Sequence, residues 1–141
     1  MKIVLISCVK GKNESRSLAK DLYKGPLFKN SLCVAKSLQT DESKIFILSA
    51  KHHLLGLNTM IDPYEMTLKT FSNKEKSDWG KKVIQELKKV SNIDTDEFII
   101  LAGKEYFNPI SEIENKVDYL GALNYGKRTA YLKSKCNESK Q

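Results

Sequence analysis

Two adjacent histidines, His52 and His53, are the only imidazoles of the chain. A neutral imidazole near pH 7 can donate a hydrogen bond to a developing oxyanion or carry a proton. Neighbouring side chains of an extended segment point to opposite sides, so the two rings are expected to have different roles. One would face a cleft, and the other would face solvent or the core. The alternative is a loop histidine that is merely held by hydrogen bonds.

Asp62 is the carboxylate whose local sequence best suits acid–base chemistry. Pro63 follows it and biases its backbone toward an extended conformation, which stiffens the presentation of the side chain. The carboxylate could then activate water or stabilise a cationic sugar centre. Asp-Pro is equally typical of a turn. Asp21 raises the same question, with a surface ion pair to a neighbouring lysine as its alternative.

Lysines and tyrosines near the expected loops favour a phosphate-bearing ligand. Lysines follow three apolar segments of the chain, at Lys10, Lys12, Lys51 and Lys104. Ammonium groups neutralise phosphates, and aromatic rings stack on bases. The candidate rings are Tyr23, Tyr64 and Tyr106, although tyrosine is also an ordinary residue at the boundary of a core.

Cys8 stands beside Lys10 and Lys12, and lysines near a thiol increase its reactivity. No order of Cys, His and Asn or Asp typical of a thiol hydrolase accompanies it, so a buried, inert thiol is favoured. The three cysteines are an odd number, which predicts free thiols in a reducing cytoplasm. No cysteine or histidine spacing indicates zinc, and neither a metal nor another cofactor is expected.

Length and composition predict one globular domain over residues 1–141. The mass is 16.0 kDa, and 40% of the residues are hydrophobic. No apolar run reaches the ~18 residues of a membrane span, and no signal peptide is recognised. The absence of a P-loop and of G-x-G-x-x-G weakens ATPase and dinucleotide-binding hypotheses. We therefore expect a cytoplasmic protein without membrane contact, with a monomer favoured.

The positive charge is concentrated in the first part of the chain. Residues 1–61 contain 10 basic and 4 acidic side chains, whereas residues 62–141 contain 14 and 13, within a net charge of +7. A local positive field favours partners that carry phosphate, and it speeds their encounter. The alternative is a lysine-rich surface that serves only solubility.

An α/β fold is predicted by the alternation of apolar and amphipathic segments. Continuous apolar runs at 2–7, 44–49 and 97–102 indicate buried parallel strands. Helical spacing follows from 28 to 38 and from 72 to 90, and weaker patterns indicate helices at 105–116 and 126–135. Trp79 and Tyr131 are expected in the core, and 133–141 is expected to be a frayed tail. The prediction is a compact, layered α/β/α domain around a mostly parallel sheet.

The carboxyl ends of these strands identify the expected site. In open α/β sheets, ligands bind beyond the carboxyl ends of the strands. Ser7 and Ser49 end the first two strands, and the candidate lysines follow the strands into loops. The sequence therefore predicts one basic cleft at this edge of the sheet.

Six motifs resemble a small bacterial and phage domain family of unknown function, itself similar to the YaaA peroxide-stress proteins. They are I-S-C-x-K-x-K (6–12), A-K-D-L-Y-K-G-P-L-F-K (19–29), I-L-S-A-K-H-x-L-L (47–55), I-D-P-Y-E-M-T-L (61–68), L-A-G-K-E-Y (101–106) and L-G-A-L-N-Y-G-K-R-T-A-Y-L (120–132). The resemblance implies an α/β fold and an association with DNA and oxidative-damage protection. The family pattern has glycine where this chain has His53, and the chain lacks the helix-hairpin-helix insertion of the longer YaaA proteins.

Carried over by position, the motifs select Ser7, Cys8, Lys10, Asp21, Tyr23, Ser49, Lys51, His52, Asp62, Tyr64 and Tyr106, to which Lys12 is added. Two hypotheses stay open. In an enzyme acting at an N-glycosidic bond, Asp62 would position water or stabilise the oxocarbenium-like centre, while His52 would hydrogen-bond the departing base. The other ten residues would bind the ligand, a nucleotide or nucleic acid. Alternatively, the domain is a non-enzymatic, DNA-associated stress protein or a phage-encoded interaction module.

Overall fold

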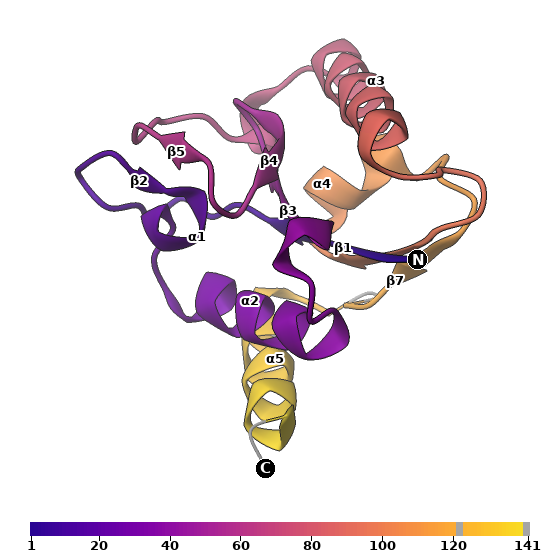
Figure 1. The fold of residues 1–141 in the computed structure, drawn as a ribbon. Coiled ribbons are helices and arrows are strands. Elements are labelled where there is room, and N and C mark those ends of the chain that lie inside the picture. Colours follow the sequence, from indigo (N-terminus) through magenta and orange to yellow (C-terminus); the bar gives the residue numbers. More distant parts are fainter. Residues whose placement is uncertain (121–122, 140–141) are drawn as a thin grey trace.

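The computed structural model describes residues 1–120 and 123–139, and a five-stranded sheet forms its centre (Figure 1). The strand order is β4-β3-β1-β6-β7, formed by β4 (His53–Gly56), β3 (Ile45–Ser49), β1 (Lys2–Ser7), β6 (Glu97–Leu101) and β7 (Lys116–Asp118). All neighbouring pairs are parallel except β3 and β4. The predicted α/β fold and its three parallel strands are therefore confirmed.

The two faces of β1 explain why its sequence is apolar without alternation. Val4 and Ile6 pack with α2 (Pro26–Leu38) and α5 (Tyr125–Ser139), whereas Ile3 and Leu5 pack with α3 (Asn73–Val90). All four side chains are fully buried. Burial of one such side chain contributes about 1.5–3 kcal/mol. Figure 1 shows α2 and α5 side by side on one side of the sheet and α3 on the other.

The starts of the two long helices follow from local sequence. Gly25 precedes α2 with φ +103°, which suits glycine, and Pro26 takes the first helical position. At α3, the Ser72 hydroxyl accepts the Glu75 backbone N–H while the Glu75 carboxylate accepts that of Ser72, forming the predicted capping box. Within the residues that the structure describes, no helix is long and apolar enough to cross a membrane.

Short elements bring distant loops to the carboxyl edge of the sheet. β2 (Ser17–Leu18) pairs with β5 (Met60–Ile61), and α1 (Ala19–Leu22) follows β2 directly. An isolated bridge joins Lys12 to Tyr23. Two 3-10 turns, η1 (Glu42–Lys44) and η2 (Leu68–Thr70), precede β3 and α3. These contacts hold the segment after β1 against the segment before α2, and hold β2 against β5.

The predicted helix at 105–116 is wrong. The chain instead forms α4 (Lys104–Phe107), a 3-10 turn η3 (Asn108–Ile110) and then strand β7. Pro109 has no N–H to donate and cannot continue a helix from its N-terminal side, so the turn tightens and stops. The strand that follows extends the sheet beside β6.

The C-terminal segment also differs from the prediction. Residues 133–139 belong to α5 and are not a frayed tail, since Leu132 and Cys136 are buried on α2. Residues 140–141 of that tail, and 121–122 of the last motif, lie outside the described residues. Tyr131 was expected in the core, but it is 37% exposed on the outer side of this helix.

A disulfide between Cys33 and Cys136 joins α2 to α5. The prediction that all three thiols are free is therefore wrong, and Cys8 alone remains a free cysteine. The two bonded residues are 103 positions apart, with Cα atoms 5.6 Å from each other. Packing of the two helices on one face of the sheet brings them together, and sequence spacing carries no sign of it.

The disulfide leads to a prediction about stability. We expect the Cys33→Ala/Cys136→Ala double variant to lose about 2–4 kcal/mol of unfolding free energy, because the bond closes a long loop in the unfolded chain. Denaturant unfolding without reductant measures this loss, and the difference should vanish when both proteins are unfolded in reductant. Air-oxidised parent protein should titrate one thiol. Three titratable thiols would contradict the bond.

Candidate functional site

The carboxyl ends of β1, β3 and β6 meet at one edge of the sheet, as predicted. Ser7 ends β1 opposite Leu48 and is half-buried, and the Cys8 N–H continues the ladder by donating to the Leu48 carbonyl at 3.0 Å. Ser49 ends β3 and is completely buried. The two predicted serines are therefore neighbours in the sheet but differ in exposure.

Ser49 is the centre of a buried set of hydrogen bonds that we call the hydroxyl network. Its Oγ lies 2.7 Å from the Tyr64 hydroxyl, which lies 2.6 Å from the Tyr23 hydroxyl. The His52 backbone N–H donates to Ser49 Oγ at 3.0 Å, and the Trp79 indole donates to the Ser49 carbonyl at 2.9 Å. Four segments of the chain are thus joined at the end of β3. Trp79 was predicted only as a core residue, so its contact with the site was missed.

The tyrosines of this network do not present their rings to solvent. Tyr23 is 2% and Tyr64 is 8% exposed. Burial raises the pKa of Tyr23 to about 12, and it raises the pKa of Tyr64 as well. Both hydroxyls therefore stay protonated at neutral pH. The expected stacking of these two rings on bases is wrong for this conformation, because the network buries them.

Lysines lie on the outer faces of the buried rings. Lys12 Nζ is 4.5 Å from the ring centroid of Tyr64 and 5.7 Å from that of Tyr23, and Lys51 Nζ is 6.0 Å from that of Tyr64. Such distances allow cation–π attraction. Partial burial lowers the pKa of Lys12, while Cys8 and Glu65 act in the opposite direction. Lys12 Nζ also donates to the carbonyl of exposed Lys10 at 3.0 Å.

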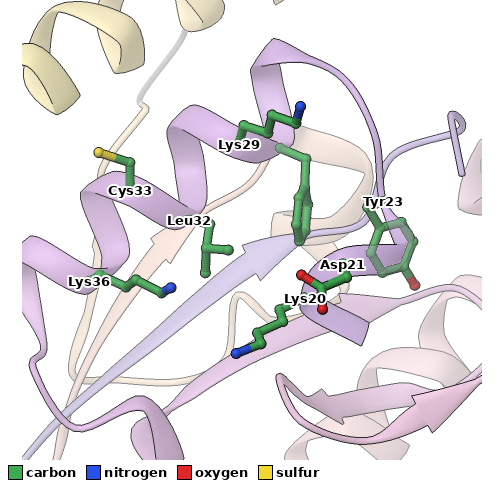
Figure 2. Close-up of a pocket in the computed structure, with 8 residues that line it drawn as sticks. Lys20, Asp21, Tyr23, Lys29, Leu32, Cys33 and Lys36 are labelled. Atoms are coloured by element: carbon green, nitrogen blue, oxygen red, sulfur yellow. The ribbon is translucent and has the colours of Figure 1, made fainter. Parts of the chain in front are cut away.

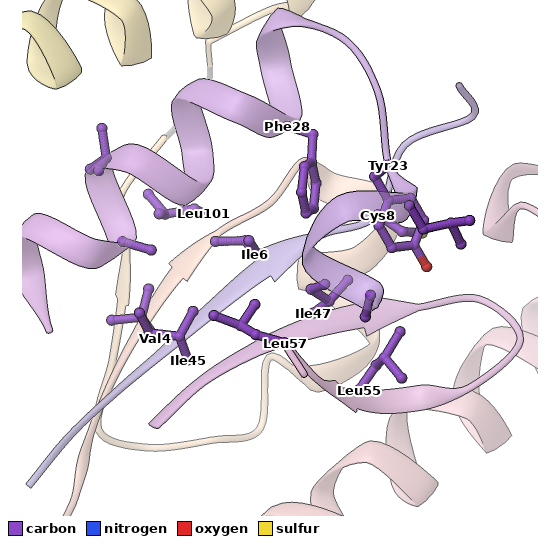
Figure 3. Packing of buried hydrophobic residues seen from close by; sticks show 14 of the residues in the cluster. Val4, Ile6, Cys8, Tyr23, Phe28, Ile45, Ile47, Leu55, Leu57 and Leu101 are labelled. Carbon is purple, nitrogen blue, oxygen red and sulfur yellow. The ribbon is translucent and has the colours of Figure 1, made fainter. Parts of the chain in front are cut away.

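Cys8 and Tyr106 form the side of the site nearest β6. The Cys8 thiol is buried, as predicted, and donates to the Tyr106 hydroxyl at 3.3 Å. Figure 3 shows Cys8 and Tyr23 at the end of the hydrophobic cluster away from Val4. The Tyr106 ring packs edge-on against Trp79 with centroids 5.7 Å apart, and burial raises its pKa. This pair closes the hydrophobic core beneath the polar edge.

His52 and His53 face different partners, as expected, but for another reason. The His52 ring packs edge-on against Tyr64 at 5.4 Å, whereas His53 Nδ1 lies 3.9 Å from Glu86 on α3. His53 has φ +63°, so a left-handed turn separates the rings instead of an extended backbone. Burial lowers the pKa of both imidazoles. His52 Nε2 is buried without a hydrogen-bond partner among the described residues.

Asp62 lies at the surface beside the network and is not hydrogen-bonded to it. Its carboxylate accepts a hydrogen bond from Arg16 at 3.1 Å, and its side chain is 70% exposed. An exposed pair of this kind contributes little to stability. Tyr64, two residues later, enters the network. The loop therefore anchors one predicted residue and leaves the other free to meet solvent.

Asp21 lies in an open groove between α1 and α2, with a volume of about 490 Å³ (Figure 2). The groove is lined by three lysines, one aspartate and mainly apolar residues: Lys20, Asp21, Tyr23, Phe28, Lys29, Leu32, Cys33 and Lys36. No ion pair of Asp21 with Lys20 or Lys24 is found in the described part of the chain. Tyr23 is shared with the hydroxyl network, so the groove and the network are adjacent.

Lys104 belongs to a different hollow. It lies on α4 and lines a depression with residues of α3, where Lys76 and Glu105 pair at 2.9 Å. Lys10, Lys12 and Lys51 therefore do not line the hollow that contains Lys104. Among residues 1–120 and 123–139, no group of three His, Cys, Asp or Glu side chains is placed to hold a metal ion.

The left-handed backbone at His53 gives a second prediction. A side chain with a Cβ is strained at φ +63°, so we expect His53→Gly to stabilise the protein by about 1 kcal/mol. Thermal or denaturant unfolding measures the change. His53→Ala is the matched control, since it removes the imidazole but keeps the Cβ. If the alanine variant is at least as stable as the glycine variant, backbone strain is not the cause.

A family model described as a family of unknown function (DUF6884) matches residues 3–134. The match extends from β1 into α5 and includes every candidate residue discussed above. No curated protein and no solved structure matches the chain.

Proposed function

The chain belongs to DUF6884, a family of unknown function, and we propose that it binds a phosphate-bearing ligand, a nucleotide or single-stranded nucleic acid, at the carboxyl edge of its sheet. The observation that carries the proposal is the pair of lysines on the Tyr64 ring. Lys12 and Lys51 approach one buried aromatic residue from two different loops. Neither has an ion-pair partner among the described residues, whereas Lys36, Lys44 and Lys76 do.

Electrostatics favour an anion at this position. Two ammonium groups near one ring repel each other, and partial burial of Lys12 weakens its contact with water. A phosphate between the lysines would offset both costs, because charge-assisted hydrogen bonds to phosphate oxygens are strong. Lys10 lies on the same loop as Lys12, and its carbonyl accepts a hydrogen bond from Lys12 Nζ.

The α1–α2 groove supports a ligand of nucleotide size. Its volume of about 490 Å³ lies in the range of ~300–1,000 Å³ that small-ligand sites occupy. Apolar side chains of Leu32 and Phe28 line it between lysines, which suits a molecule with a flat apolar part and an anionic part. Since Tyr23 belongs to both the groove and the network, the two are adjacent.

Binding can be tested by exchanging charge at matched positions. We expect Lys12→Gln/Lys51→Gln to weaken binding of a single-stranded oligonucleotide about tenfold, measured by fluorescence anisotropy at low salt. The slope of log K against log salt should fall by about 1–2, because two phosphate contacts are lost. Lys88→Gln/Lys133→Gln is the control, since both residues are exposed and the net charge changes equally. Equal losses in the two double variants would reduce the lysines to a solubility surface.

Cleavage or exchange at an N-glycosidic bond is a second candidate function. The buried, unpartnered Nε2 of His52 favours it, because an unsatisfied buried nitrogen costs free energy that a ligand hydrogen bond removes. His52 packs on Tyr64, and Asp62 precedes that tyrosine by two residues. A base near His52 and a sugar near Asp62 would fit the expected roles. Asp62 would first have to exchange its contact with Arg16.

The enzymatic proposal has its own test. Asp62→Asn keeps the shape of the side chain and removes the charge, so turnover should fall ~10²-fold or more if the carboxylate stabilises the reacting centre. His52→Ala should also reduce turnover. Activity is measured on a panel of nucleosides and damaged oligonucleotides, with Asp94→Asn as an exposed acidic control. If both variants turn over substrate as the parent does, the enzymatic proposal is wrong and only the binding function remains.

The non-enzymatic alternative is a DNA-associated stress protein or a phage-encoded interaction module. The resemblance to the YaaA proteins supports the first form, and the basic residues of 1–61 support contact with nucleic acid. We also propose a monomer. The cytoplasmic location expected from the sequence assumed free thiols, and the Cys33–Cys136 disulfide argues against it, because such bonds are rare in a reducing compartment.

A further inference from the structure

Arg128 on α5 lies at the carboxyl end of β6, close to Gly103, which follows that strand. A Cβ built on Gly103 would lie 2.1 Å from Nη1 of Arg128 and 3.2 Å from its Cζ. Real Cβ atoms are essentially never found at 2.1 Å, so a side chain at 103 would require the end of the guanidinium to move. The glycine of L-A-G-K-E-Y and the arginine of the last motif are therefore complementary in shape.

One donor of the guanidinium is nevertheless unsatisfied. Its Nε is buried and has no hydrogen-bond partner, and no ion pair of Arg128 is found in the described part of the chain. Arginine keeps its charge in proteins, and buried charges are normally paired. By contrast Arg16, the only other arginine, is paired with Asp62 at the surface. Among the described residues, Arg128 is therefore a half-buried cation without a paired carboxylate, which an anionic ligand could supply.

We infer that Arg128, whose guanidinium fills the space that Gly103 leaves open, binds a phosphate group of the ligand at the carboxyl end of β6. A guanidinium presents parallel N–H donors that match two oxygens of a phosphate. The end of β6 belongs to the same sheet edge as the ends of β1 and β3, where Lys12 and Lys51 lie. The choice of phosphate rests on the proposed function, but the position of the anion site rests on Arg128 alone.

The two arginines allow a direct test in the intact protein. The Arg16→Gln variant assigns the two Nε–H signals in a nitrogen-15 NMR spectrum. Titration with inorganic phosphate, against chloride at equal ionic strength, should shift the Arg128 signal and leave the Arg16 signal in place. Movement of neither signal, or equal movement of both, overturns the anion site.

Binding variants separate this inference from the proposed function. We expect Arg128→Gln to weaken binding of a mononucleotide or an oligonucleotide at least tenfold, whereas Lys127→Gln, an exposed neighbour with the same charge change, should alter it less than threefold. Arg128→Lys should restore only part of the affinity, because an ammonium lacks the planar fork. Gly103→Ala should weaken binding without changing charge. Unfolding curves check that each variant is folded.

The outcomes distinguish the two proposals and the source of the phosphate. Loss of oligonucleotide binding in the Lys12/Lys51 double variant, with parent-like binding by Arg128→Gln, overturns the arginine site and leaves the proposed function standing. A phosphate-dependent shift of Arg128 without binding of any nucleotide or oligonucleotide supports the anion site and refutes the proposed function. If the Arg128 signal shifts with a mononucleotide but not with an oligonucleotide that lacks terminal phosphates, the site binds a terminal phosphate. If it shifts with both, the site binds backbone phosphate.

Discussion

The hydroxyl of Ser49 is completely buried at the end of β3, and a buried hydroxyl must be satisfied by the protein itself. Tyr64 and the His52 backbone N–H supply its hydrogen bonds, while Trp79 on α3 binds the carbonyl of the same residue. Tyr64 then holds Tyr23, and with it the segment between α1 and α2. Replacing this serine by an apolar residue would leave the His52 N–H without its partner and would remove one of the two hydrogen bonds of the Tyr64 hydroxyl.

The hydroxyl network gives Tyr23 and Tyr64 a structural role in place of the expected contact with a ligand. Their rings are buried, and their protonated hydroxyls are engaged with one another, so they act as a rigid support. The rings support two ammonium groups, since Lys12 lies against two of the rings and Lys51 against one. Cations on aromatic faces keep their positions with less loss of freedom on binding than free lysines would. If an anion binds here, Lys12 and Lys51 would therefore already be close to their bound positions.

The elements that could be predicted from sequence are those specified by local pattern. Continuous apolar runs identify β1, β3 and β6 because both faces of each strand are covered, and the capping box identifies the start of α3. Strand β7 was missed because it is short and polar, and the helix expected there ends at Pro109. The pairing of Cys33 with Cys136, and that of Tyr23 with Tyr64, join residues 103 and 41 positions apart. Such pairings follow from the packing of layers and leave no trace in spacing.

The motif residues divide into two groups once their surroundings are known. Ser49, Tyr23 and Tyr64 are satisfied by one another, so their side chains have little left to offer a ligand. Arg128 is the opposite case, because it belongs to a motif and yet finds no partner in the described part of the chain. Its role depends on its closeness to Gly103, a residue 25 positions away in sequence that has no side chain to signal it. Under the proposed function, the cations without an ion-pair partner would contact the ligand, and the hydroxyl network would hold the loops that carry Lys12 and Lys51.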